Sequence, residues 1–175
     1  MSEPLFAALL ALLVILAIVA IRAGDLLVAV IVLGAYGFVM SLIWTTIGAV
    51  DVAFTEAVVG AGVSTVLFLA ALLRTSRRRS PLPGKLRWVA LGAVTAVGAL
   101  LLAVTGALPP WGDATAAPAT HVSPRYITET MAETATPNAV TSVLADYRAY
   151  DTLIETVVIF SAGLGGWLLL ARRDQ

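Results

Sequence analysis

Long runs of apolar residues dominate this chain and predict five membrane-spanning helices. A bilayer core is about 30 Å thick, so a helix needs about 20 mostly apolar residues to cross it. Five segments meet that requirement, residues 5–21, 26–47, 50–73, 86–108 and 153–171. Polar or helix-breaking residues separate them: Arg22-Ala23-Gly24-Asp25, a weaker break at Gly48, and Arg74 to Arg87 with Pro81, Pro83 and Gly84. We therefore predict an all-α integral membrane protein.

The long segment between the fourth and fifth spans is predicted to contain short amphipathic helices. Pro109-Pro110 ends the fourth span, and the Ala/Thr/Pro-rich stretch through Thr120 is typical of a loop. Ser123-Pro124 predicts an N-cap followed by the first residue of a helix to about Glu133. A second helix is expected after Pro137-Asn138, on the outer membrane surface or against a partner subunit. Its apolar stripe, at i, i+3, i+4 and i+7, is Val140, Val143, Leu144 and Tyr147.

The distribution of basic residues predicts that the N-terminus lies outside the cell and the C-terminus inside. Cytoplasmic loops carry an excess of Lys and Arg. With the N-terminus outside, only Arg125 and Arg148 fall on the outer side. The basic residues on the cytoplasmic side are then Arg22, Arg74, Arg77, Arg78, Arg79, Lys85, Arg87, Arg172 and Arg173.

A labelling experiment tests this orientation. We expect a cysteine at Ser2 to react with an impermeant thiol reagent from outside the cell, and a cysteine at Gln175 to react from the cytoplasm. Cytoplasmic labelling of residue 2 would overturn the predicted topology.

The composition excludes several classes of function. Hydrophobic residues make up 59% of the chain and charged residues 13%, which excludes a soluble globule. There is no cysteine, and the single histidine, His121, lies in an outer loop, so we expect no cofactor, no metal site and no enzymatic chemistry. The basic run Arg77-Arg78-Arg79 is interpreted first as a topology determinant and second as a site that attracts anionic lipid. Nucleic-acid binding is not expected.

Glu56 is the main candidate for function, because it interrupts the third apolar run. A carboxylate near the bilayer centre costs about 2.5–3.5 kcal/mol on insertion scales, and such residues mark ion paths. Asp51, at the predicted start of this helix, is interpreted first as its N-cap, and Glu56 lies too far along for that role. Gly60 and Ser64 continue its row at intervals of four, as Gly37, Ser41 and Thr45 do in the second span. Small residues explain close helix packing, but they do not explain a carboxylate among them.

Glu155 is a second candidate, with an equally good structural explanation. Thr152-Leu153-Ile154-Glu155 has the spacing of a capping box. The predicted topology also places Glu155 and Glu56 at similar depth in the outer leaflet, where a pair of carboxylates could pass a proton or cation to the bundle interior. Both interpretations of Glu155 remain open, and Asp151 is a weaker candidate for the same path.

Two stretches of the chain resemble known families. Gly34-Ala35-Tyr36-Gly37, and Gly48 through Asp51, Thr55-Glu56-Ala57 and Gly60-Ala61-Gly62, resemble the D subunit (MbhD) of membrane-bound hydrogenases and the matching C-terminal region of the Mrp-type antiporter A subunit. The second stretch resembles the adjoining E-type module. It runs from Ser123-Pro124-Arg125 through Pro137-Asn138 to Asp146-Tyr147-Arg148-Ala149-Tyr150-Asp151-Thr152-Leu153-Ile154-Glu155, where Ala149 and Ile154 replace two glycines of the family pattern.

The resemblance implies a D-like three-helix module over residues 1–80 and an E-like two-helix module over 81–175. It implies a small, non-enzymatic subunit of a multisubunit Mrp-type sodium(cation)/proton antiporter in a prokaryotic cell membrane, with large antiporter-like subunits, lipid, Na⁺ and H⁺ as partners. The alternatives are a subunit of an ion-pumping hydrogenase or related redox complex, and a purely structural scaffold. Residue by residue, the resemblance covers Glu56 and Asp51 in the first stretch and Asp146, Arg148, Asp151 and Glu155 in the second. With the hydroxyl and small residues of the helix rows added, we predict two sets of site residues. The ion-path residues, around a transient monovalent cation near Glu56, are Glu56, Asp51, Glu155, Asp151, Thr45 and Ser41, and the interface or structural residues are Asp146, Arg148, Gly60 and Ser64.

Overall fold

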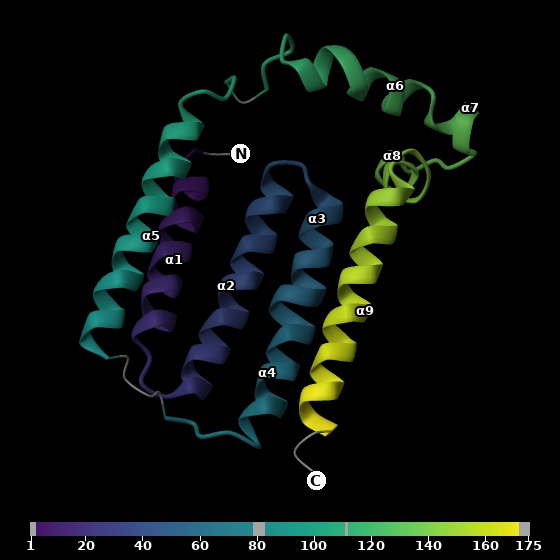
Figure 1. Cartoon of the computed structure of the whole chain (residues 1–175). Coiled ribbons are helices and arrows are strands. Elements are labelled where there is room, and N and C mark those ends of the chain that lie inside the picture. The colour runs from purple at the N-terminus through teal and green to yellow at the C-terminus, as the bar shows by residue number, and fades with distance from the viewer. Residues whose placement is uncertain (1–2, 79–82, 111, 172–175) are drawn as a thin grey trace. The chain divides into compact units, whose positions relative to one another are not determined.

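Five helical segments are long and apolar enough to cross a membrane, which confirms the predicted all-α class and number of spans (Figure 1). The computed structural model describes residues 3–78, 83–110 and 112–171, and no strand forms among them. The spans are α1 (Glu3–Arg22), α2 (Leu26–Thr46), a composite third span of α3 (Val50–Thr55), η1 (Glu56–Val63) and α4 (Ser64–Leu72), then α5 (Gly84–Thr105) and α9 (Ala149–Ala171). Arg79, Pro81, Arg172 and Arg173, which entered the topology prediction, lie outside the described residues, as do Ser2 and Gln175.

The chain divides into two compact units, residues 1–94 and residues 95–175. In the first unit α2 is central, because it packs against α1 and against all three parts of the third span (Figure 1). Leu13 of α1 and Val39 and Ile43 of α2 form a small buried cluster. The predicted break before α2 is confirmed, and Asp25 caps that helix by accepting a hydrogen bond from the Leu27 amide at 2.7 Å.

The turn between α2 and the third span shows that Asp51 is not a cap. Gly48 adopts φ +85°, a left-handed conformation that glycine adopts without steric cost. The helix then begins at Val50, with Ala49 at the N-cap and no side-chain capping bond. Asp51 therefore lies inside the first turn, where its charge complements the helix dipole without capping an amide.

The third span is not a regular α-helix. Its middle section, η1, is a π-helix of eight residues that begins at Glu56. π-Helical turns are rare, and they occur frequently at functional sites. Neither the hydrophobic pattern nor the glycine spacing predicted this irregularity.

The outer segment is more helical than predicted. A π-helical turn, η2 (Pro118–Val122), already begins within the stretch predicted as a loop. It leads into α6 (Ser123–Thr128), so Ser123 continues an existing helix and makes no side-chain cap. A separate short helix, α7 (Thr130–Thr134), completes the predicted region.

The second predicted outer helix is present, and an asparagine side chain caps it. Asn138 accepts a hydrogen bond from the Thr141 amide at 3.0 Å and caps α8 (Ala139–Ser142), which continues as the π-helical turn η3 (Val143–Tyr147). The fifth span begins at Ala149, four residues before the predicted start, so Thr152 already lies within the helix. Its hydroxyl donates to the Leu144 carbonyl at 2.7 Å. The capping-box interpretation of Glu155 is therefore wrong, because Thr152 is not at the helix N-cap.

Candidate functional site

Glu56 is the first residue of η1, and its side chain lies along the same helix, over Gly60. The residue is half-buried. A Cβ added to Gly60 would overlap Glu56 Oε1 and would lie 2.8 Å from Glu56 Cδ. The carboxylate therefore rests directly on the Gly60 backbone, in space that only glycine leaves open.

The same carboxylate reaches the contact between the third span and α2. Gly37 of α2 is buried. A Cβ at this position would lie 2.9 Å from the Gly60 carbonyl carbon, 3.0 Å from the Ala61 nitrogen and 3.2 Å from Glu56 Oε1. The two backbones thus approach as closely as glycine permits, and Glu56 lies beside this contact, directed at α2.

The close approach continues along α2 through Gly34. A Cβ there would lie 2.6 Å from Thr65 Oγ1 and 3.5 Å from the Ala61 carbonyl oxygen. Ser64, at the end of the predicted row, is half-buried at the start of α4. The small-residue rows noted in the sequence therefore do meet, where Gly37 on α2 lies against Gly60 on η1. Gly34, one turn away on α2, extends this contact to Ala61 and Thr65.

Polar groups of α2 continue from this contact toward the turn at Gly48. Ser41 lies one helical turn beyond Gly37 and is 8% exposed. Its carbonyl oxygen accepts the hydroxyl of Thr45 at 3.0 Å. Thr45 itself is exposed, and so is Asp51 across the turn. On the third span, the hydroxyl of Thr55 donates to the carbonyl oxygens of Asp51 and Val52, at 3.2 and 3.0 Å.

The acidic residues of the second motif belong to the other compact unit. Asp151, in the first turn of α9, accepts a hydrogen bond from Nε of Arg148 at 2.6 Å and forms an ion pair with its Nη2, also at 2.6 Å. This ion pair neutralises the charge of Asp151 where α9 begins. Glu155 lies one turn further along and is exposed, and Asp146 is exposed on η3.

A polar cluster in the outer segment was not predicted. The Glu133 carboxylate accepts a hydrogen bond from the guanidinium of Arg125 at 2.9 Å and another from the phenol hydroxyl of Tyr147 at 2.5 Å. The ring of Tyr147 packs on that of Tyr126, with centroids 4.8 Å apart. Between α7 and α8, Thr134 and the fully buried Ser142 share a hydrogen bond of 2.8 Å. The sequence pattern placed Tyr147 on an apolar stripe. Its phenol hydroxyl is the one feature of the sequence that could have indicated a hydrogen-bond partner here.

The hydrogen bond from Tyr147, and then the bond from Arg125, hold the pKa of Glu133 below its usual 4.5. A carboxyl whose pKa falls on folding stabilises the fold above the unfolded-state pKa. We therefore expect this contribution to be full above pH 4.5 and to disappear as the pH falls through the lower, folded-state value. The hydrogen bond to Glu133 also raises the pKa of Tyr147. The contribution of Tyr147 to the stability of the fold is therefore lost as the pH rises through this raised pKa.

Replacement of Tyr147 by Phe tests the cluster. We expect the pKa of Glu133 to rise toward its usual value, because the variant removes the main group that stabilises the carboxylate. An NMR titration of the Glu133 carboxyl carbon in micelles measures this shift. The variant Tyr150→Phe, which changes an exposed tyrosine, is the control. An unchanged Glu133 titration in Tyr147→Phe would contradict the hydrogen-bonded arrangement.

Comparison with known proteins agrees with the resemblance seen in the sequence. Residues 11–77 match the family model MbhD, the D subunit of MBH. The chain is 31% identical over 169 residues to the putative antiporter subunit mnhA2 of Staphylococcus aureus strain MRSA252, and 30% identical to that of strain JH9. These matches cover 93% of this chain and 20% of each relative, so the chain spans about a fifth of their length.

A solved structure agrees with these matches. The chain aligns with a chain in the structure of the Mrp complex from Dietzia sp. DQ12-45-1b, with a TM-score of 0.76 and 29% identity. The alignment covers 96% of this chain and 18% of the other. Together the comparisons confirm an MbhD-like region that is similar to part of an Mrp A subunit, in a multi-pass membrane protein.

Proposed function

From this similarity we propose that the chain works as a membrane subunit of a multisubunit Mrp-type cation/proton antiporter, and that Glu56 contributes to its ion path. The relatives are named as antiporter subunits, and the similar solved structure is that of an Mrp complex. The chain spans only about a fifth of those relatives. That it works with large antiporter-like subunits, Na⁺ and H⁺ is therefore also our proposal.

The position of Glu56 is the observation that carries the proposal. A carboxylate in a membrane span is costly, and it is tolerated where it faces protein or a wet cavity. Glu56 is half-buried against α2, with its oxygens over Gly60 and beside Gly37. The π-helix that starts at the same residue makes this the least regular part of the span. A carboxylate held between two helices in this way can take up and release a proton or a hard monovalent cation.

The remaining acidic and hydroxyl residues receive different roles. Ser41 and Thr45 extend the polar face of α2 beyond Gly37, and Asp51 lies across the turn at Gly48, so these three are proposed to line the approach to Glu56. Glu155 is proposed as a second carboxylate of the path, since its capping role does not hold. Asp151, paired with Arg148, is better suited to fixing the start of α9 than to binding an ion.

Replacement of Gly60 by Ala tests whether the position of the carboxylate matters. The added methyl group would occupy the space of the Glu56 carboxylate and displace it. Because that carboxylate ends a flexible side chain, we expect assembly to be retained while antiport activity falls. The matched control is Gly98→Ala in α5, where an added Cβ meets nothing within 4 Å. Normal antiport in Gly60→Ala, with the complex intact, would show that transport does not depend on the position of the Glu56 carboxylate.

Affinity purification of the full-length chain tests the complex itself. We expect large antiporter-like membrane subunits to co-purify. The match to MbhD supports the second candidate, an ion-pumping hydrogenase-type complex. Co-purification of iron–sulfur and nickel proteins in place of antiporter subunits would favour that candidate.

We also retain as a proposal the division into a D-like module over residues 1–80 and an E-like module over 81–175.

A further inference from the structure

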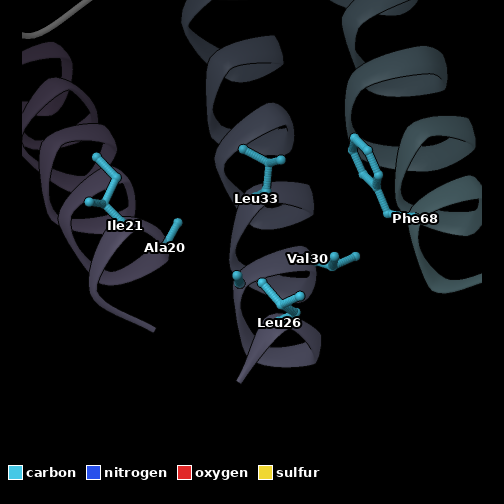
Figure 2. A pocket seen from close by; sticks show the side chains of 7 residues that line it. Ala20, Ile21, Leu26, Val30, Leu33 and Phe68 are labelled. Atoms are coloured by element: carbon cyan, nitrogen blue, oxygen red, sulfur yellow. The ribbon is translucent and has the colours of Figure 1, made fainter. Parts of the chain in front are cut away.

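A crevice lined by apolar side chains opens between α1, α2 and α4 (Figure 2). Ala20 and Ile21 come from α1, Leu26, Val30 and Leu33 from α2, and Phe68 reaches toward them from α4. Its volume is about 260 Å³, and a second hollow of about 190 Å³ shares Ala20, Ile21 and Leu33 with it. Because the two hollows share these residues, they are neighbours, and we refer to them together as the groove.

Arginine residues gather at one end of this groove. Leu26, which lines the groove, donates its backbone amide hydrogen to the Arg77 carbonyl oxygen at 2.8 Å. The backbones of Asp25 and Arg78 pair as an isolated antiparallel β-bridge. The segment 73–78 is therefore fixed to the start of α2. Together with residues 22–25, from the end of α1 to the start of α2, it carries four exposed arginines, Arg22, Arg74, Arg77 and Arg78. Asp25 is the one acidic residue in these two segments, 3.9 Å from Arg77.

We propose that this groove binds one acyl chain of an anionic phospholipid, whose phosphate lies among these arginines. Leu33 lies seven residues beyond Leu26, so the groove runs about 10 Å into the membrane from the arginine-rich end. That is the order expected for a phospholipid, with the charged headgroup at the interface and the acyl chain below it. Basic pockets beside transmembrane helices bind anionic headgroups in this way.

The composition of the groove favours a lipid over a helix of another subunit. Helix pairs in membranes meet through small residues and interhelical polar contacts. On α2 the small residues Gly34 and Gly37 are already used against the third span. The groove is lined instead mainly by bulky side chains, such as Ile21, Leu33 and Phe68. A flexible acyl chain fits such an irregular apolar surface.

Lipid binding to the purified, delipidated full-length protein tests this proposal by native mass spectrometry. The probes are phosphatidylglycerol and phosphatidylcholine. The variant Ala20→Phe fills the groove, and we expect it to lower the occupancy of both lipids at least about fivefold. The matched control is Ala11→Phe, which lies nine residues away on the opposite face of α1 and should bind lipid normally. Ala29→Phe, on the α2 side, repeats the test if Ala20→Phe does not fold.

The arginines are tested separately through lipid selectivity. In Arg77→Gln/Arg78→Gln we expect the preference for phosphatidylglycerol over phosphatidylcholine to fall by at least about fivefold, because the loss of either one of these two charges near the surface would have about that effect. Arg87→Gln, on α5, is the control. Equal lipid binding by Ala20→Phe, Ala29→Phe and Ala11→Phe would overturn the proposal. Loss of a co-purifying subunit in Ala20→Phe, with lipid binding unchanged, would also overturn it and assign the groove to a protein partner. Neither result depends on the ion path at Glu56.

Discussion

Replacement of Glu56 by Gln is expected to lower cation/proton antiport at least about tenfold while leaving the complex assembled. Glutamine keeps the size of the side chain, so its packing over Gly60 and beside Gly37 is preserved. What is lost is the ionisable oxygen pair. A hydrogen bond to a charged group is worth about 1.5–3 kcal/mol, and the loss of one contact of that size with a bound ion corresponds to about tenfold or more in ion binding. Antiport by the complex in proteoliposomes, measured with a pH-sensitive dye, gives the activity directly.

Glu129→Gln is the matched control for this experiment. Glu129 is an exposed carboxylate of the outer segment, so its replacement removes the same charge away from the membrane spans. We expect normal assembly and normal antiport. If Glu56→Gln also assembled and transported normally, the chain would be a scaffold, and the carboxylate would serve only the packing of α2 against η1.

Replacement of Gly37 by Ala is expected to have the largest effect on stability. The added Cβ would lie 2.9 and 3.0 Å from backbone atoms of Gly60 and Ala61, which cannot move aside as a side chain can. Overpacking of this kind costs about 1–3 kcal/mol. We expect a lower thermal unfolding temperature of the purified chain and a lower yield of assembled complex.

Gly92→Ala provides the comparison for Gly37→Ala. Gly92 lies within α5, and an added Cβ there meets nothing within 4 Å. Alanine also favours a helix over glycine, so we expect its unfolding temperature to be unchanged or slightly raised. An equal unfolding temperature for Gly37→Ala and Gly92→Ala would contradict the close contact between α2 and η1.

The five spans were predictable because the cost of burying polar groups in lipid leaves a strong signal in the sequence. The same physics identified Glu56, since a carboxylate within an apolar run stands out against the hydrophobic pattern. The rows of small residues containing Gly37 and Gly60 also predicted where two helices approach. These signals are local and periodic, and they can be read without knowledge of the packing.

The parts that were not predicted depend on contacts distant in the sequence or on small differences in where a helix begins. Asp51 and Thr152 both have the residue type of a cap, but each lies inside the helix that it would have to precede. The π-helix at Glu56 replaces one backbone hydrogen-bonding pattern with another, and no residue type marks that exchange. The cluster of Arg125, Glu133 and Tyr147 joins residues 8 and 14 positions apart, across helix boundaries that the pattern did not resolve.

Modification of Glu56 by an apolar carbodiimide, followed by peptide mass spectrometry of the intact complex, is the most direct test of whether this carboxylate exchanges ions. Such reagents react with protonated carboxyl groups within the membrane. We expect labelling of Glu56 to increase as the pH falls and to decrease when the transported cation is added. Labelling that responds to neither pH nor cation would show that the carboxylate does not exchange ions and would contradict its place in an ion path.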